Sequence, residues 1–399
     1  MDRKTFLASM GAIGVAPFVP SAPLWPRGLA APGDYLFTPG LVYLQTGSLG
    51  PTPRPVLERT IDAWKELELD PVRIGYGPDE VAMDGVRAQA AAFLGCKPEE
   101  MVLTRSTTDG MNWVAQGLSL GSGDHILTTD QEHPGGRVCW DYVARRYGAV
   151  IDVVVIPPGE NDAGAIADRF ARQITPRTRV LSFSHLLTST GLRMPVAEIA
   201  TLARARGCIV VVDGAQAAGG VAVDVKALGC HVYATSGHKW LLGPKGTGLL
   251  YLSEELGRAV DPIALQSGRA AYSESSGVTN IPGVIGLGAA IAYHLDPGIA
   301  AIESHNLALR NRLYEALKGV PRIRVVSSPP GPLASPMLSY VLPDRVDALT
   351  LHNAFRERHN VVVKVVPTNW FNGHRISTHL FNTESDVDAL VGALRSELA

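Results

Sequence analysis

The residues with the clearest chemical potential are a lysine and an aspartate that precedes it in the chain. Lys239 stands in the run Ser-Gly-His-Lys-Trp, and Asp213 ends the apolar run Ile-Val-Val-Val-Asp. A lysine that is partly removed from water can lose its proton near neutral pH and form a Schiff base. A carboxylate beside a pyridine nitrogen keeps that nitrogen protonated, so that the ring accepts electrons. Together the two residues indicate an enzyme of pyridoxal phosphate (PLP), with Lys239 as the catalytic residue.

Small hydroxyl residues supply candidate ligands for the phosphate group of this cofactor. Thr107 and Thr108 follow an expected strand and precede Gly110 at the start of an expected helix. Free N–H groups at helix N-termini bind phosphate. A Ser or Thr followed by Asp is also an ordinary helix cap, so this signal is weak by itself. Ser236 and His238 would complete the phosphate site from the other side.

Three more residues could contact the cofactor or the substrate. His133 follows the end of another expected strand, where it could stack on the pyridine ring or be a loop histidine without a ligand. Gln216 could hydrogen-bond the phenolic oxygen of the cofactor or be an ordinary turn residue. The Arg375 guanidinium offers a planar, bidentate grip on a carboxylate. The alternative for Arg375 is a surface salt bridge.

The elements that would position these residues alternate along the chain from about Leu36. Apolar, β-branched runs predict strands over residues 101–106, 125–130, 150–157, 179–185, 208–214 and 246–252. Helix-like stretches lie between them, at residues 108–118, 136–148 and 195–207. Such alternation predicts an α/β fold with a mostly parallel sheet covered by helices on both faces. Ligands bind at the carboxyl ends of such strands, which is where Asp213 lies.

After about residue 290 the pattern changes to that of a smaller α+β unit. A long amphipathic helix over 305–320 precedes expected strands at residues 322–328, 336–342 and 360–366, and a helix at 385–399 closes the chain. We therefore expect a large PLP-binding domain over 34–295 and a small C-terminal domain over 296–399. Residues 1–33 precede both domains and belong to neither of them.

The first 33 residues have the shape of an export signal. Arg3-Lys4 is followed by the uncharged stretch 5–26 and by the small residues Gly28-Leu29-Ala30 at a possible cleavage site. The start resembles a twin-arginine signal in which lysine replaces the second arginine. Four prolines make a membrane-spanning helix a poor interpretation. We expect a periplasmic protein, and the alternative is a disordered arm on a cytoplasmic one.

The overall composition argues against several other classes of function. A formal net charge of -2 gives no reason to expect nucleic acid or an anionic membrane as a partner. The four cysteines form no CxxC pair, and the histidines show no metal-ligand spacing. A disulfide framework and a metal site are therefore not expected.

Taken together, the motifs resemble the class V aminotransferase family of fold-type I PLP enzymes, from residues 43–53 to 375–390. The resemblance implies a homodimer with active sites at its interface and an amino-acid substrate. It favours transamination, with epimerisation or racemisation (as in isopenicillin N epimerase-like members) and C–S or β-elimination lyase chemistry as alternatives. A PLP-fold binding module without turnover is a different class, and the intact set of site residues argues against it.

Two positions depart from the family's patterns. Cysteine desulfurases carry a catalytic cysteine on the loop before the substrate-binding arginine, but residues 364–375 contain none. A persulfide mechanism would therefore lack its nucleophile. Relatives often have Gly-Thr-x-Asn where the partner subunit reaches the phosphate. Here the run is Gly277-Val278-Thr279-Asn280, so Thr279 is displaced by one position.

Overall fold

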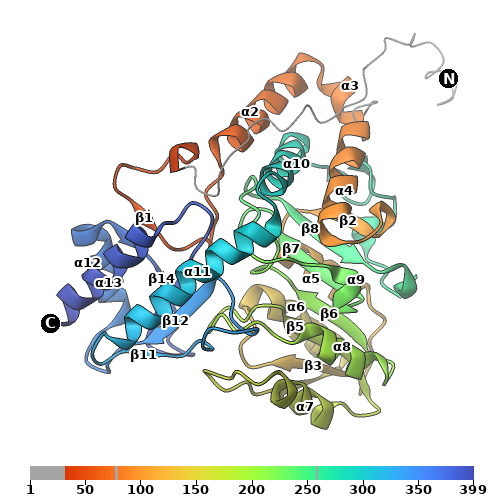
Figure 1. Ribbon diagram of the computed structural model, residues 1–399. Helices are drawn as coiled ribbons and strands as arrows, with labels where there is room; N and C mark the ends of the chain where they lie inside the picture. Colours follow the sequence, from red (N-terminus) through yellow and green to blue (C-terminus); the bar gives the residue numbers. More distant parts are fainter. Residues whose placement is uncertain (1–31, 77–79, 258) are drawn as a thin grey trace, which may run out of the picture.

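The computed structural model describes residues 32–76, 80–257 and 259–399 (Figure 1). Residues 1–31, on which most of the export prediction falls, lie outside the described residues. Figure 1 shows the C-terminal unit, in blue, beside a larger unit built around a sheet in green and yellow. The long helix α11 (Ile299–Lys318) extends from the larger unit to the C-terminal one.

The larger unit contains a seven-stranded sheet of the predicted, mostly parallel type. Strand β8 is antiparallel to both of its neighbours, and the other neighbouring pairs are parallel. In spatial order the strands are β2 (Met101–Thr104), β8 (Gly248–Leu252), β7 (Val232–Ser236), β6 (Ile209–Asp213), β5 (Thr178–Ser184), β3 (His125–Thr129) and β4 (Val150–Val154). The predicted α/β fold class is confirmed.

Helices cover both faces of this sheet, which explains why its strands are apolar throughout. Alternate residues of one strand point to opposite faces, so Val211 packs in one core while Val210 and Val212 pack in the other. The first core includes residues of α5 (Thr107–Gly117) and α6 (Pro134–Tyr147). The second includes residues of α4 (Glu80–Leu94), α7 (Ala163–Gln173), α8 (Val196–Arg204), α9 (Val225–Leu228) and α10 (Ile281–Leu295).

The C-terminal unit has its own sheet and its own core. Its four antiparallel strands are, in order, β11 (Arg324–Val325), β12 (Met337–Val341), β15 (Gly373–Ser377) and β14 (Lys364–Val365). Helix α11 contributes to this core with α12 (Ala348–His359) and α13 (Glu384–Leu398). The chain turns between α10 and α11 at residues 296–298. The division into domains at this point stays a prediction.

One predicted strand is two strands in the structure. Residues 360–366 form β13 (Val361–Val362), which pairs with β1 (Val42–Tyr43), and then β14, which pairs with β15. The chain changes partner at Val363, and an apolar run cannot reveal such a change. Leu44, just after β1, also belongs to the C-terminal core.

The remaining elements join the two units or border them. Helix α10 packs against both α2 and α4. No single helix in the described ranges is long and apolar enough to cross a membrane. Helices α10 and α11 together meet the length and composition criteria but are bent by 74°. The other described elements are α2 (Arg54–Leu69), α3 (Pro71–Tyr76), β9 (Tyr272–Ser273), β10 (Gly277–Val278), and the 3-10 helices η1 (Pro32–Asp34), η2 (Pro98–Glu100), η3 (Glu254–Leu256) and η4 (Ile263–Leu265).

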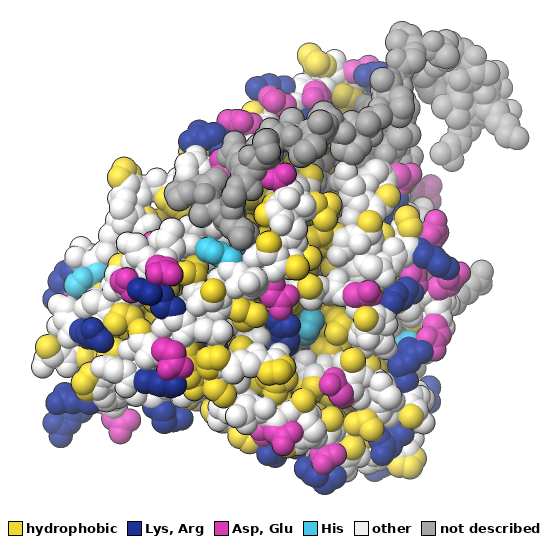
Figure 2. Space-filling model, viewed as in Figure 1, with side chains coloured by type: hydrophobic (Ala, Val, Ile, Leu, Met, Phe, Trp, Pro, Cys, Tyr) yellow, Lys and Arg dark blue, Asp and Glu magenta, His cyan; other side chains and the backbone are white. Residues whose placement is uncertain are grey.

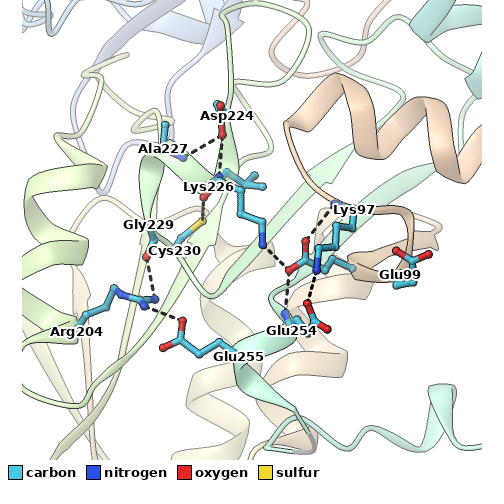
Figure 3. Close-up of polar contacts among 12 residues, drawn as sticks. Lys97, Glu99, Arg204, Asp224, Lys226, Ala227, Gly229, Cys230, Glu254 and Glu255 are labelled. Carbon is cyan, nitrogen blue, oxygen red and sulfur yellow. Dashed lines mark hydrogen bonds and ion pairs between the residues drawn. The ribbon is translucent and has the colours of Figure 1, made fainter.

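A polar cluster lies at the end of the large sheet where strand β2 begins and strand β8 ends (Figure 3). The carboxylate of Glu100, with its side chain only 2% exposed, accepts hydrogen bonds from Lys226 Nζ and from the backbone N–H groups of Lys97 and Glu254. Lys97 Nζ also lies 2.7 Å from a Glu254 carboxylate oxygen. Asp213 is the last residue of β6 and lies at the opposite end of the strands.

The surface visible in Figure 2 carries Lys and Arg side chains interspersed with Asp and Glu. This mixture agrees with the net charge of -2. An extended field of one sign, as nucleic-acid binding requires, is not present on this face.

Candidate active site

A cavity of about 440 Å³ lies at the carboxyl ends of the parallel strands of the large sheet, between that sheet and the C-terminal unit. Asp213 ends β6, Ser236 ends β7, and Arg375 reaches the cavity from β15. This one cavity is lined by the predicted catalytic, cofactor-binding and substrate-binding residues Thr107, Thr108, His133, Asp213, Gln216, Ser236, His238, Lys239 and Arg375. The crossovers of the parallel sheet bring these distant segments together, as expected for a ligand site in an α/β fold.

Lys239 lies on the loop that joins β7 to β8. Removal from water lowers the pKa of Lys239 to about 8; Arg375 also lowers it, and Asp213 opposes the shift. A fraction of the amine is therefore unprotonated at neutral pH and able to act as a nucleophile or a base.

The residue after this lysine anchors the loop. Trp240 is fully buried, and its backbone carbonyl lies 2.9 Å from His294 Nε2 and 2.7 Å from His379 Nε2. Its indole N–H donates to Gln216 Oε1 over 2.9 Å. Held in this way, the chain directs Lys239 into the cavity.

Asp213 is buried at the end of β6, where its Oδ1 accepts the Ala215 N–H over 2.9 Å. Burial raises the pKa of Asp213, and this N–H and the Lys239 charge oppose the rise. A cationic ring nitrogen beside the carboxylate would favour its ionised form. A β-carbon on Gly136 would lie 2.4 Å from Asp213 Oδ2, so only glycine leaves room for the carboxylate there.

The predicted phosphate ligands meet at one end of the cavity. The Thr107 N–H donates to Ser236 Oγ over 3.0 Å, and the hydroxyls of the two residues are 2.8 Å apart. Helix α5 begins at Thr107, so its N-terminal N–H groups lie at this end of the cavity. His238 lines the same cavity. Hydroxyls and a helix N-terminus fit a phosphate group.

His133 caps α6 at the mouth of the cavity. Its Nδ1 accepts the Gly135 N–H over 3.0 Å, which leaves the proton on Nε2. Partial loss of hydration lowers the pKa of His133, the charges of Lys239, Arg375 and Lys364 act in the same direction, and together they bring it to about 4. The ring is therefore neutral at pH 7 and suited to stacking on a cofactor.

The Gln216 side chain is held by the protein on both sides. Its Nε2 donates to the Gly47 carbonyl over 2.9 Å while its Oε1 accepts from Trp240. The amide nitrogen carries two hydrogens, so one remains for the predicted contact with the cofactor.

Arg375 is a buried cation without an acidic partner among the described residues. Its Nη1 donates to the backbone and side-chain oxygens of Thr188, at 3.0 and 2.8 Å, and its Nη2 lies 3.4 Å from Ser48 Oγ. Burial lowers the pKa of Arg375 to about 10, which still leaves it charged at neutral pH. A buried guanidinium beside an open cavity suits an anionic ligand, because its charge is otherwise uncompensated.

The sequence analysis missed Gly47, which lines the cavity, and Glu132, which precedes the lining residue His133. Glu132 accepts hydrogen bonds from Ser184 Oγ and Thr129 Oγ1, and burial raises its pKa to about 7 with a contribution from Asp213. Gly47 leaves room for Gln216 and Arg375, since a β-carbon there would lie 2.9 and 2.8 Å from their polar atoms. A glycine in an apparent turn gives no indication in the sequence that it lies against Gln216 and Arg375.

Thr279 lies outside this cavity and lines a second one of about 630 Å³. Among the described residues, no group of three or more His, Cys, Asp and Glu side chains is placed to hold a metal ion.

Comparisons with known proteins agree with the geometry. The sequence model of the family "Aminotransferase class-V" matches residues 42–390. The isopenicillin N epimerase of Streptomyces clavuligerus is 32% identical over 386 residues, which cover 91% of this chain and 96% of the epimerase. The solved cysteine desulfurase CsdA of Escherichia coli is 28% identical, with a TM-score of 0.79 over 92% of this chain and 97% of CsdA. The cystine C–S lyase C-DES shares the fold at 24% identity, with a TM-score of 0.82 and coverage of 90% and 98%.

Proposed function

Because the chain belongs to the class V aminotransferase family and is a PLP-dependent enzyme, we propose that it transfers the amino group of an amino acid. When bound, the cofactor supplies an electron sink for the bonds at the substrate's α-carbon. The observation that carries the proposal is the convergence of a lysine of lowered pKa, a buried aspartate and an unpaired buried arginine on one cavity.

Each of these residues has a separate task. Lys239 would hold the cofactor through its amine and would serve as the base for the proton on the substrate's α-carbon. Asp213 holds the proton on the cofactor's ring nitrogen through its negative charge. Arg375 binds the α-carboxylate and so orients the bond to be broken.

His133 is not suited to the second proton transfer that epimerisation needs. Aminotransfer needs a single proton-transfer group on one face of the substrate, and Lys239 would supply it. Inversion at the α-carbon needs a proton delivered from the opposite face. His133, with a pKa of about 4, is no proton donor at neutral pH. Epimerisation is the second candidate because the epimerase of Streptomyces clavuligerus aligns over 91% of this chain.

Sulfur transfer through a persulfide has little support. No cysteine follows Cys230 in the sequence, so the loop before Arg375 has no thiol. Cys139, Cys208 and Cys230 are buried, and burial raises the pKa of Cys139 and of Cys230 to about 12. Thiols of this kind are poor nucleophiles.

A panel of L- and D-amino acids, each with and without a 2-oxo acid acceptor, tests the proposed activity. We expect formation of a new amino acid from the acceptor. Interconversion of enantiomers without an acceptor would instead identify an epimerase, and release of ammonia or sulfide would identify a lyase. A PLP-loaded protein that reacts with no member of the panel would be a binding module.

The Arg375→Lys variant is expected to lose activity although the charge is kept. Lysine cannot form the bidentate contact, and charge-assisted hydrogen bonds contribute about 1.5–3 kcal/mol each, so kcat/KM for amino acids should fall about tenfold to a thousandfold. The cofactor absorbance should not change. The control is Arg312→Lys, which alters a surface arginine paired with Asp388. Unchanged amino-acid kinetics in Arg375→Lys, or simple amines outperforming amino acids in the wild type, would contradict the assignment.

Two further proposals concern assembly and location. We propose a homodimer, since large apolar side chains are exposed on α2, α3 and η4, including Leu69 at 85%, Val72 at 71% and Ile263 at 81%.

We also propose export, which rests on the basic start and uncharged stretch of the first 33 residues.

A further inference from the structure

A second cation without an acidic partner lies in the same cavity as Arg375. Lys364 lines the cavity from β14, and its Cα is the direct partner of Arg375 across the β14–β15 pair. Directly opposed residues of an antiparallel pair point to the same face of the sheet, with β-carbons about 5 Å apart. Lys364 and Arg375 therefore enter the cavity side by side.

Nothing in the described part of the protein balances the Lys364 charge. No hydrogen-bond acceptor and no carboxylate lies within bonding distance of its Nζ among the described residues. Loss of hydration lowers the pKa of Lys364, and the Arg375 charge lowers it further. Two cations held together cost free energy unless an anion is bound between or beside them.

The charged residues of the cavity show which cation is available for such an anion. The described charged residues of its lining are Asp213 and the cations Lys239, Lys364 and Arg375. In the proposed function Asp213 pairs with the ring nitrogen, Lys239 binds the cofactor and Arg375 binds the α-carboxylate. Lys364 is the one of these four residues to which the proposed function gives no task.

The wall beside Lys364 is apolar. Val366, Pro367 and Trp370 follow it in the chain and line the same cavity. Apolar surface next to an unpaired cation fits a ligand with a short hydrocarbon chain that ends in an anionic group.

We propose that the substrate is an amino acid whose side chain carries a second anionic group, and that Lys364 binds this group beside Arg375. The proposal rests on the amino-acid substrate of the proposed function and adds its side-chain class. Lys364 is a specificity-determining residue that selects an acidic side chain. The anion is a carboxylate or a phosphate, which have the same need for a cationic partner.

Calorimetric titration of the holoenzyme with unreactive probes tests this directly. Succinate and glutarate carry both anionic groups but no amine, and their monoamides, succinamate and glutaramate, lack only the second charge. We expect the better diacid to bind at least about tenfold more tightly than its monoamide, as one charge-assisted contact provides. Adding 3-phosphonopropionate to the series shows whether a phosphate-like group is preferred to a carboxylate.

Three variants show whether Lys364 is responsible. Lys364→Met should remove the preference for the diacid and leave monoamide binding unchanged, whereas Lys364→Arg should keep the preference. Lys318→Met, which removes an exposed cation of the same unit, is the matched control and should behave as the wild type. Thermal unfolding of each holoprotein checks that the fold is intact.

Two results would overturn the proposal: no diacid preference in the wild type, or an equal loss of diacid and monoamide binding in Lys364→Met. The second result would assign Lys364 to the α-carboxylate instead. Failure of the proposed function has a different signature, since aminotransfer is measured with reactive amino acids. An enzyme that transfers amino groups from neutral amino acids but shows no diacid preference refutes this inference alone.

Discussion

Replacing Lys239 with alanine is expected to reduce turnover by at least about a thousandfold, since the change removes both the covalent anchor and the general base. Borohydride reduction of the wild-type holoenzyme should fix the cofactor on Lys239, which peptide mass spectrometry can locate. The variant should still bind PLP through the phosphate end of the cavity, where Thr107 and Ser236 meet, but reduction should not fix it. Circular dichroism tests that the fold is retained.

The control for this prediction is a second lysine close to the same loop. Lys245 Nζ donates to the Gly50 carbonyl and to Thr52 Oγ1, outside the cavity lining, so Lys245→Ala should keep the reducible attachment at Lys239. Finding the reduced label on Lys245, or substantial turnover in Lys239→Ala, would refute the assignment.

The pH dependence of cofactor attachment provides a second test of Lys239 as the residue that attaches the cofactor. Burial lowers the pKa of Lys239 to about 8. Below this pH the ammonium form prevails and cannot attack the cofactor's aldehyde, so the attachment rate should rise with pH and level off above about 8. A rate that falls across this range would contradict the assigned nucleophile.

Asp213→Asn is expected to have the next largest effect. Asparagine keeps the shape and the acceptor for the Ala215 N–H but removes the negative charge. Loss of one member of a buried charge pair costs about 2–5 kcal/mol, which corresponds to a rate about thirtyfold to several thousandfold lower. Steady-state kinetics and cofactor absorbance should show slow turnover with the cofactor still attached.

The same substitution at another capping aspartate separates charge from capping. Asp224 Oδ1 accepts the N–H groups of Lys226 and Ala227 at the start of α9 (Figure 3), and Asp224 does not line the cavity. Asp224→Asn should leave turnover unchanged. Near-normal rates in Asp213→Asn would show that Asp213 is only a cap, as its contact with Ala215 alone would suggest.

The candidate site could be predicted from the sequence because its residues lie in short motifs at strand ends. Asp213 after four apolar residues and Lys239 after Ser-Gly-His each had a local signal. The alternation of apolar and helical segments likewise predicted the large sheet, whose strands are buried on both faces.

The parts that sequence reasoning missed depend on contacts between distant segments. Thr188 supports Arg375, and His294 and His379 hold the Trp240 carbonyl, across separations that no periodicity records. Lys364 was hidden for another reason. Residues 360–366 were expected to form one strand, and only the pairing of β14 with β15 places Lys364 beside Arg375.

The most direct test of the account follows the hydrogen on the substrate's α-carbon. Purified holoenzyme is incubated with α-deuterated amino acids and a 2-oxo acid acceptor, and NMR records loss of the deuterium together with formation of the new amino acid. The account predicts that both occur in the wild type and that both are lost in Lys239→Ala. Retention of deuterium with every amino acid, in a protein whose cofactor is attached to Lys239, would contradict it.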